Sequence, residues 1–275
     1  MTAKSCAFGI FLLFMGCGSS EQGGGTGGSA GRGGAASTAG GGASGGEGAA
    51  SGGVGTARVL VFSRTLGYRH DSIERGVAAL DELGHERGFS VVASEDAARF
   101  ADASLGAFDV VVFLCTTGDV LDDSQQDAFR RFVQRGGGFI GIHSASDTEY
   151  SWPWYGELVG AYFRAHPAIQ PAALVVENGV HPATVGLPTR WLRTDEWYAF
   201  QTNPRPQVDV LLRLDESSYS PGDTGMEGDH PIAWAHEFDG GRAFYTGLGH
   251  TQASYDEPEF RAHLTGAIEW AARLR

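Results

Sequence analysis

The histidines are the residues of this chain whose types and positions point most directly to chemistry. Six of the nine stand beside turn residues or at the end of an apolar run, whereas His85, His236 and His263 fall inside helix or strand patterns and are interpreted as structural. Because the ends of parallel strands lie side by side along one edge of a sheet, we expect the six to converge. They are His70, His143, His166, His181, His230 and His250.

His143 stands in the stretch that organises the chain, Gly136 to Asp147. Three glycines break a preceding helix, a short apolar run follows, and polar residues then arrive together at the point where a buried strand should end. In open α/β sheets, ligands bind at the carboxyl ends of strands, so this turn is a predicted site. The alternative interpretation is an ordinary polar loop after a core strand.

Carboxylates accompany these histidines. Asp195 and Glu196 precede two aromatic residues, and Asp229 directly precedes His230. Sets of imidazoles and carboxylates suit either a divalent metal ion or a general acid/base pair near neutral pH. The chain has no HExxH motif and no paired cysteines, so acid/base chemistry is favoured over a metal site. If a divalent metal is bound, His166 and His230 are the predicted ligands.

Aromatic side chains cluster beside the polar motifs. Tyr and Trp offer a flat apolar face and a polar tip, which suits the CH face and hydroxyl groups of a sugar ring. The alternative is that they pack in the core. The predicted substrate-binding residues are Tyr68, His70, Trp152, Trp154, Asp195, Glu196, Trp197 and Tyr198.

The elements that must position these groups follow a βαβ pattern. An apolar run at 58–63 is followed by a helix capped by Asp71 and ended by Gly88, and Asp122 or Asp123 caps a second helix that ends at Gly136. The pattern predicts an α/β fold with a mainly parallel sheet and helices on both faces. Further predicted strands cover 89–93, 108–114, 139–142, 172–177, 208–214, 232–238 and 242–248. Further predicted helices run from Trp152 to near Phe163 and from 259 to 272.

The chain divides into three predicted parts. Residues 1–17 combine a basic start with a short apolar run, as in a secretory signal, and the segment ending at Cys17 resembles a bacterial lipobox. Residues 18–57 are almost entirely Gly, Ala, Ser and Thr, which predicts a disordered tether. Residues 58–275 form one domain. We therefore expect an exported lipoprotein, anchored at Cys17 on the outer membrane or periplasmic face, with plain secretion as the alternative.

Charge and cysteine content narrow the classes of function. The net charge of −13 lies in the domain and argues against nucleic acid or anionic lipid as a partner. Cys6 and Cys17 belong to the signal segment, which leaves Cys115 alone in the domain and excludes a disulfide within it. No Gly-rich motif of the dinucleotide-binding type stands at the start of a predicted helix, so the sequence gives no sign of a nucleotide site.

Over almost all of residues 58–272 the chain resembles the ThuA-like family, which is named for trehalose utilisation. Several ordered motifs carry the resemblance, and we find no block of the domain that departs from the pattern. The motifs are Gly67–Ile73, Gly136–His143, Trp152–Tyr155, His166-Pro167, His181–Thr184, Asp195–Tyr198, Asp229–Trp234 and Gly247–Thr251.

The resemblance implies a flavodoxin-like fold similar to class I glutamine amidotransferases. Those enzymes carry a nucleophilic cysteine on a strand-to-helix elbow, where this chain has His143, and a catalytic histidine after a late strand, which His250 resembles. Without a thiolate there is no nucleophile for glutamine hydrolysis, so we do not expect an amidotransferase.

Two functions remain open at this point. The first is an enzyme acting on disaccharides or keto-sugars, with His143 and His250 as acid/base residues and with His166, Asp195, Glu196 and His230 positioning the substrate or a metal. The second is a non-catalytic carbohydrate-binding lipoprotein, in which the aromatic residues form a stacking platform. The sugar, the reaction and the oligomeric state do not follow from the sequence.

Overall fold

The structure is a computed structural model that describes residues 56–274. The predicted signal (residues 1–17), its lipidation site Cys17 and the predicted tether as far as residue 55 lie outside the described residues. Within residues 56–274, every helix is too short or too polar to cross a lipid bilayer.

A nine-stranded sheet forms the middle layer, in the order β2-β1-β3-β4-β11-β10-β9-β6-β7. The first five strands pair in parallel, and the remaining pairs are antiparallel. The strands are β1 (Arg58–Phe62), β2 (Ser90–Ser94), β3 (Val110–Leu114), β4 (Gly138–Ile142), β6 (Gln170–Val176), β7 (Arg190–Asp195), β9 (Asp209–Leu214), β10 (His230–Phe238) and β11 (Gly241–Thr246), and β5 (Phe163–Ala165) pairs separately with β8 (Ala199–Phe200).

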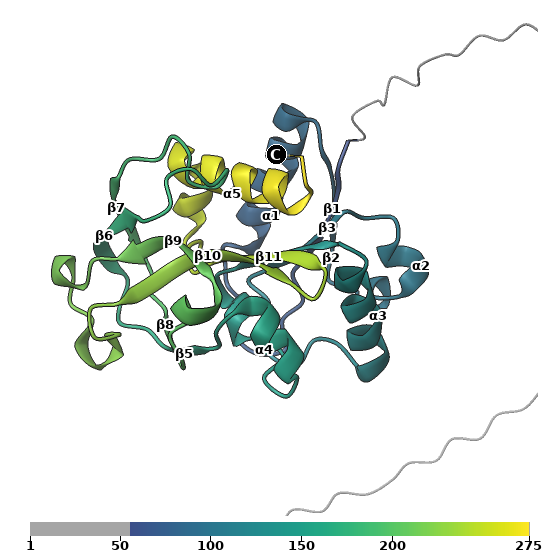
Figure 1. Cartoon of the computed structure of the whole chain (residues 1–275), viewed down its shortest axis with the longest axis horizontal. Helices are drawn as coiled ribbons and strands as arrows, with labels where there is room; N and C mark the ends of the chain where they lie inside the picture. Colours follow the sequence, from purple (N-terminus) through teal and green to yellow (C-terminus); the bar gives the residue numbers. More distant parts are fainter. Residues whose placement is uncertain (1–55, 275) are drawn as a thin grey trace, which may run out of the picture. The chain divides into compact units, whose positions relative to one another are not determined.

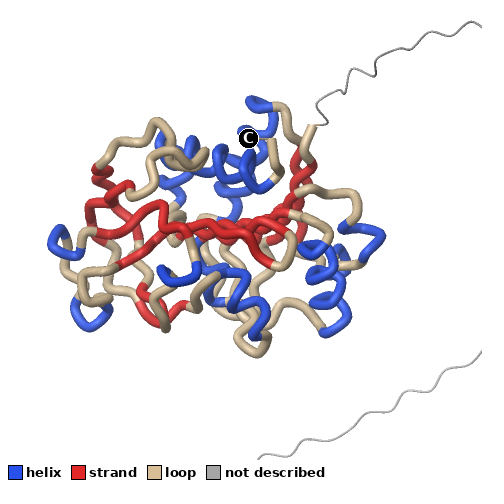
Figure 2. The backbone as a smooth tube through the Cα atoms, in the orientation of Figure 1, coloured by secondary structure: helices blue, strands red, loops and turns tan. Residues whose placement is uncertain are grey.

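Helices cover both faces of this sheet, as Figures 1 and 2 show. α1 and α5 lie on one face, and α3 and α4 lie on the other. The predicted α/β class, with a mostly parallel central sheet, is therefore confirmed for the described residues. The helices are α1 (Ile73–Arg87), α2 (Asp102–Leu105), α3 (Asp123–Gln134), α4 (Pro153–Val159) and α5 (Pro258–Ala271).

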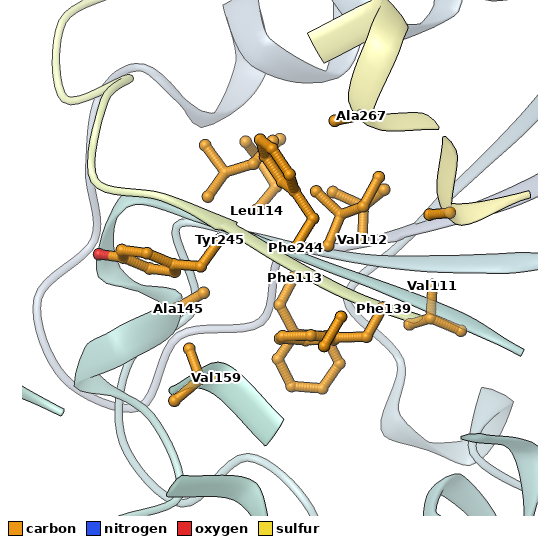
Figure 3. Packing of buried hydrophobic residues seen from close by; sticks show 14 of the residues in the cluster. Val111, Val112, Phe113, Leu114, Phe139, Ala145, Val159, Phe244, Tyr245 and Ala267 are labelled. Atoms are coloured by element: carbon orange, nitrogen blue, oxygen red, sulfur yellow. The ribbon is translucent and has the colours of Figure 1, made fainter. Parts of the chain in front are cut away.

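β3 and β4 lie in the middle of the core, with helices packed on both faces of the sheet. Successive strand residues point to opposite faces, so each of these strands supplies two layers at once. Phe113 stacks on Phe129 of α3 with ring centroids 5.4 Å apart. Figure 3 shows Val112 and Phe244 on the opposite side of the sheet, toward Ala267 of α5. Every residue of β3 and β4 is buried.

Several elements differ from the sequence prediction, and the short elements α2, β5 and β8 were not predicted. The N-cap of α1 is Ser72, not Asp71, because a turn that begins at the His70 carbonyl already holds the Ile73 N–H. α4 ends at Val159, before the predicted end near Phe163, because Gly160 turns the chain with φ 90°. The edge strand β7 was not predicted, because half of its residues are exposed and it has no apolar run.

Candidate functional site

Four side chains meet at the carboxyl edge of the parallel strands. His70 lies in the loop after β1, His143 directly follows β4, His250 lies in the turn after β11, and Glu196 directly follows β7. One side-chain nitrogen or oxygen of each lies within 4.8 Å of the others. We call these four residues the His–Glu cluster. Four segments that are distant in the sequence therefore build one site.

His143 occupies a strained position. It has φ 52°, a left-handed conformation that is costly for a residue with a β-carbon. It closes β4 and opens a short 3₁₀ turn, so the backbone reverses sharply and directs the imidazole out of the strand. The Tyr245 hydroxyl donates to the His143 carbonyl at 2.8 Å and holds this conformation.

The contacts within the cluster are short. Nε2 of His143 lies 3.1 Å from Nδ1 of His250, and Oε2 of Glu196 lies 3.0 Å from the same Nδ1 and 3.5 Å from Nε2 of His143. The His70 ring packs edge-on against His143 and His250, with centroid distances of 4.7 and 5.1 Å. The ligand atoms of all four groups therefore surround one small volume.

The hydrogen bonds around the cluster assign the tautomer of His143. Its Nδ1 lies 3.0 Å from the Gly247 carbonyl, which can only accept. Nδ1 therefore carries the hydrogen, and in the neutral ring Nε2 presents a lone pair to the cluster. Nδ1 of His70 lies 3.3 Å from the Ser144 hydroxyl, which anchors the second buried imidazole.

A buried ion pair holds the turn that carries His250. The Asp195 carboxylate accepts the N–H groups of Gly249 and His250 at 2.9 and 3.1 Å, and Arg193 lies 3.2 Å from it. Both side chains of this pair are buried. Asp195, predicted to bind substrate, lies behind the cluster, where its contacts position the His250 turn.

A cavity of about 470 Å³ opens onto the cluster. Its size is that of a site for a small organic ligand. Tyr198 forms part of the wall, and its ring lies 4.2 Å from both the His143 ring and the Phe163 ring. The lining residues are Tyr68, His70, Asp147, Phe163, His166, Glu196, Tyr198 and His250.

His166 lies on the cavity wall, outside the four-residue cluster. Its Nδ1 lies 3.1 Å from Oε1 of Glu196 and 3.0 Å from the Pro167 carbonyl. Both partners accept, so Nδ1 carries the hydrogen, and the neutral ring has its lone pair on Nε2. Within residues 56–274, that Nε2 has no hydrogen-bond partner. Glu196 therefore joins His166 on one oxygen to His250 on the other.

Burial and mutual charge set the protonation of the site. Burial lowers the pKa of His70 to about 3, and the charges of His143 and His250 act in the same direction. Burial alone would raise the pKa of Glu196, but the imidazoles of His143 and His250 outweigh it and hold that pKa well below its usual range. Burial alone would lower the pKa of His250, and the Glu196 carboxylate reverses this and raises it.

Several predicted site residues lie away from the cavity. Trp152 and Trp154 stack on each other, with centroids 4.9 Å apart, and Trp154 donates to Asp239. Trp197 is fully buried and donates to the Gln170 carbonyl. These three indoles do not line the cavity. Of the predicted aromatic residues, Tyr68 and Tyr198 line it.

His181 and His230 do not join the other four strand-end histidines. His230, predicted as a metal ligand, places Nδ1 2.8 Å from Glu216 and donates through Nε2 to the Tyr198 carbonyl at 2.8 Å. It therefore supports the cavity wall from behind. His181 packs against Trp270 with ring centroids 5.0 Å apart. The six-fold convergence expected from the sequence is reduced to four residues.

Sequence reasoning missed some contributors to the site. Phe163 lines the cavity, and Arg193 pairs with Asp195, but neither stands in a recognisable motif. Arg193 lies in a strand whose residues alternate between exposed and buried, but the sequence does not mark the buried face, since Leu192 is exposed and Arg193 is buried. Its inward direction follows from pairing with β6, which the local sequence does not specify.

The comparisons with known proteins agree with this architecture. A family model described as trehalose utilisation, ThuA, matches residues 58–271. The chain belongs to the ThuA family. A solved ThuA-like protein from Bacteroides uniformis is 23% identical with a TM-score of 0.65, and the match covers 78% of this chain and 90% of that one.

A second solved ThuA-like protein, from Parabacteroides merdae, is 21% identical with a TM-score of 0.66. The match covers 80% of this chain and 91% of that one. At these identities the two structures show the shared fold alone. A search of curated proteins gave no match.

Proposed function

We propose that this ThuA chain is a carbohydrate-processing enzyme that acts on a disaccharide or keto-sugar by acid/base chemistry, without a cysteine nucleophile. The observation that carries the proposal is the pair of short contacts from Glu196, 3.0 Å to His250 and 3.1 Å to His166, at a cavity walled by aromatic rings. The family description, trehalose utilisation, supports a disaccharide as the substrate class.

The floor and the wall of the cavity have different tasks in this reaction. Two imidazoles of the His–Glu cluster, His70 and His250, line the cavity, and a ring N–H of either one stabilises a sugar oxygen as it gains negative charge. His166, on the wall, donates its Nδ1–H to Glu196 and so has its lone pair on Nε2. That nitrogen is the base that accepts a proton from the sugar. A keto group makes the adjacent C–H acidic, so one electrophile at the keto oxygen and one base at the C–H are enough for proton abstraction.

Cys115, the cysteine within residues 56–274, does not serve this chemistry. Cys115 is fully buried, and burial raises the pKa of its thiol to about 12. The thiol therefore stays protonated at neutral pH, and a thiolate is needed for nucleophilic attack. Acid/base catalysis by imidazoles fits the available groups better than covalent catalysis.

The test is a turnover assay of the purified chain against trehalose, other disaccharides and their keto derivatives, with mass spectrometry of the products. We expect one of these sugars to be converted, and His166→Ala to lower kcat by at least about 100-fold. The matched control is His85→Ala, which removes a largely exposed imidazole from α1.

Two results would contradict the proposal. Unchanged turnover in a folded His166→Ala chain would remove the assigned base. Sugar binding by calorimetry, without product from any member of the panel, would favour the non-catalytic carbohydrate-binding protein.

A further inference from the structure

We infer that the His–Glu cluster binds one divalent transition-metal ion through His70, His143, Glu196 and His250. The inference deepens the proposed function and rests on it only for the ion's task, which is to replace the cluster N–H groups as the electrophile at the cavity floor. The binding itself is argued from the geometry of these four residues.

The spacing of the ligand atoms fits a single cation. Ligands about 2.1 Å from a metal ion lie roughly 3.0 to 3.4 Å from one another in octahedral or tetrahedral geometry. The three separations among His143 Nε2, His250 Nδ1 and Glu196 Oε2 are 3.1, 3.0 and 3.5 Å. A ligand atom of His70 completes the set within 4.8 Å.

The hydrogen bonds outside the cluster orient its ligands. A metal-bound histidine commonly donates its other ring N–H to a carbonyl or carboxylate, which fixes the tautomer. His143 does this through Nδ1, which donates to the Gly247 carbonyl at 3.0 Å and leaves the Nε2 lone pair for the cluster. Glu196 keeps His166 on its second oxygen, so Oε2 remains available.

A bound cation also explains why three imidazoles lie so close together. His70, His143 and His250 lie with ring centroids 4.7 to 5.1 Å apart, and two of the three are fully or almost fully buried. Among residues 56–274, Glu196 is the one carboxylate in this group. A cation shared by all four groups takes up the lone pair on His143 Nε2 and is balanced by the Glu196 carboxylate.

The donor set selects the class of ion. Three imidazoles and one carboxylate suit Zn²⁺ and its neighbours among the transition metals, whereas Mg²⁺ and Ca²⁺ prefer sites built of oxygen. Glu196 and His250 line the cavity, so an ion can reach the cluster from solvent.

The experiment is a calorimetric titration of the purified full-length chain, stripped with a chelator, with ZnCl₂ and separately with MgCl₂. We expect one Zn²⁺ per chain and no measurable Mg²⁺ binding. Glu196→Gln and His250→Ala should each weaken Zn²⁺ binding by more than about 100-fold, since even residues outside the ligand shell contribute 10- to 100-fold. His85→Ala, the matched control on α1, should bind like the wild type.

X-ray absorption of the Zn²⁺-loaded wild type provides a readout that needs no variant, and we expect three imidazoles in the coordination shell. Absence of Zn²⁺ binding, a shell without imidazoles, or unchanged affinity in a folded Glu196→Gln chain would overturn the inference. Zn²⁺ bound at the cluster of a chain that converts no sugar would uphold the inference and remove the proposed function. Full turnover by a chain that binds no metal would uphold the proposed function and overturn the inference.

Discussion

His143 shows how one residue links backbone strain to the chemistry of the site. Its left-handed backbone costs about 1–2 kcal/mol, and neighbouring groups hold it in place. Gly247 fixes the ring through Nδ1, and Tyr245 fixes the carbonyl. Cys115, at the end of the adjacent strand, has a similar φ of 50°, and both side chains are fully buried. Equivalent backbone positions therefore carry an imidazole that faces the cluster and a thiol that lies against Ser72 and Tyr255.

The environment of Cys115 predicts that its thiol resists alkylation in the folded chain. Burial raises its pKa to about 12, so roughly a thousand-fold less thiolate is present than at an ordinary cysteine. We expect iodoacetamide at pH 8 to label Cys115 at least about 100-fold more slowly in buffer than in urea. Mass spectrometry of the peptide that contains Cys115 distinguishes it from Cys6 and Cys17. Equal labelling rates in both conditions would show that the thiol is accessible.

At the scale of elements, the turn between β11 and α5 depends on a glycine. Gly249 has φ 105°, and a β-carbon there would lie 2.9 Å from the Tyr255 hydroxyl and 3.2 Å from Ile142. Its N–H donates to Asp195, and its carbonyl accepts from Ser72 at the start of α1. The turn thus joins β7 and α1 through one residue and delivers His250 to the cluster.

We predict that Gly249→Ala destabilises the chain and displaces His250. Strain at a positive φ and overpacking against Tyr255 together should lower the free energy of unfolding by about 2–4 kcal/mol. The matched control is Gly186→Ala, because Gly186 has φ 84° but nothing within 4 Å of the added β-carbon. Urea denaturation should show the larger loss for Gly249→Ala, and equal losses would contradict the argument from close packing.

The βαβ half of the fold followed from local patterns, and the second half did so less fully. Capping at Asp122 and the apolar run of β3 are properties of consecutive residues, so they were predicted within a few positions. β7 has one exposed face and no apolar run, and its strand character comes from pairing with β6. The position of Glu196 in the site was therefore not predictable from local patterns, because Glu196 directly follows β7.

At the scale of the whole molecule, packing of α5 against the sheet buries two histidines away from the cavity. His263 is fully buried, with Nδ1 donating to the Ala183 carbonyl at 2.7 Å, and His181 lies close to the same segment. Burial lowers the pKa of each to about 4. Both histidines must therefore be neutral for this layer to pack, which couples folding to pH.

We predict that acid destabilises the chain partly through His263. Its unfolded pKa is about 6.5 and its folded pKa about 4, so its contribution is complete above pH 6.5 and is lost as the pH falls toward 4. His263→Gln keeps a donor for Ala183 but does not titrate. Between pH 6 and pH 4 its unfolding free energy should fall less steeply than that of the wild type, by about 1.4 kcal/mol per pH unit at most. Identical slopes in urea denaturation would contradict the assignment.

The sequence by itself determined the elements of the parallel half, the family and the placement of histidines at strand ends, because each depends on residues that are close along the chain. Only the tertiary structure decided which histidines meet. His181 and His230 stand beside turns just as His70 and His250 do, yet they pack elsewhere. Convergence depends on strand order and direction, and β7, at the far edge of the sheet, returns the chain so that Glu196 reaches His143 and His250. That return is fixed by packing between distant segments, which no local pattern encodes.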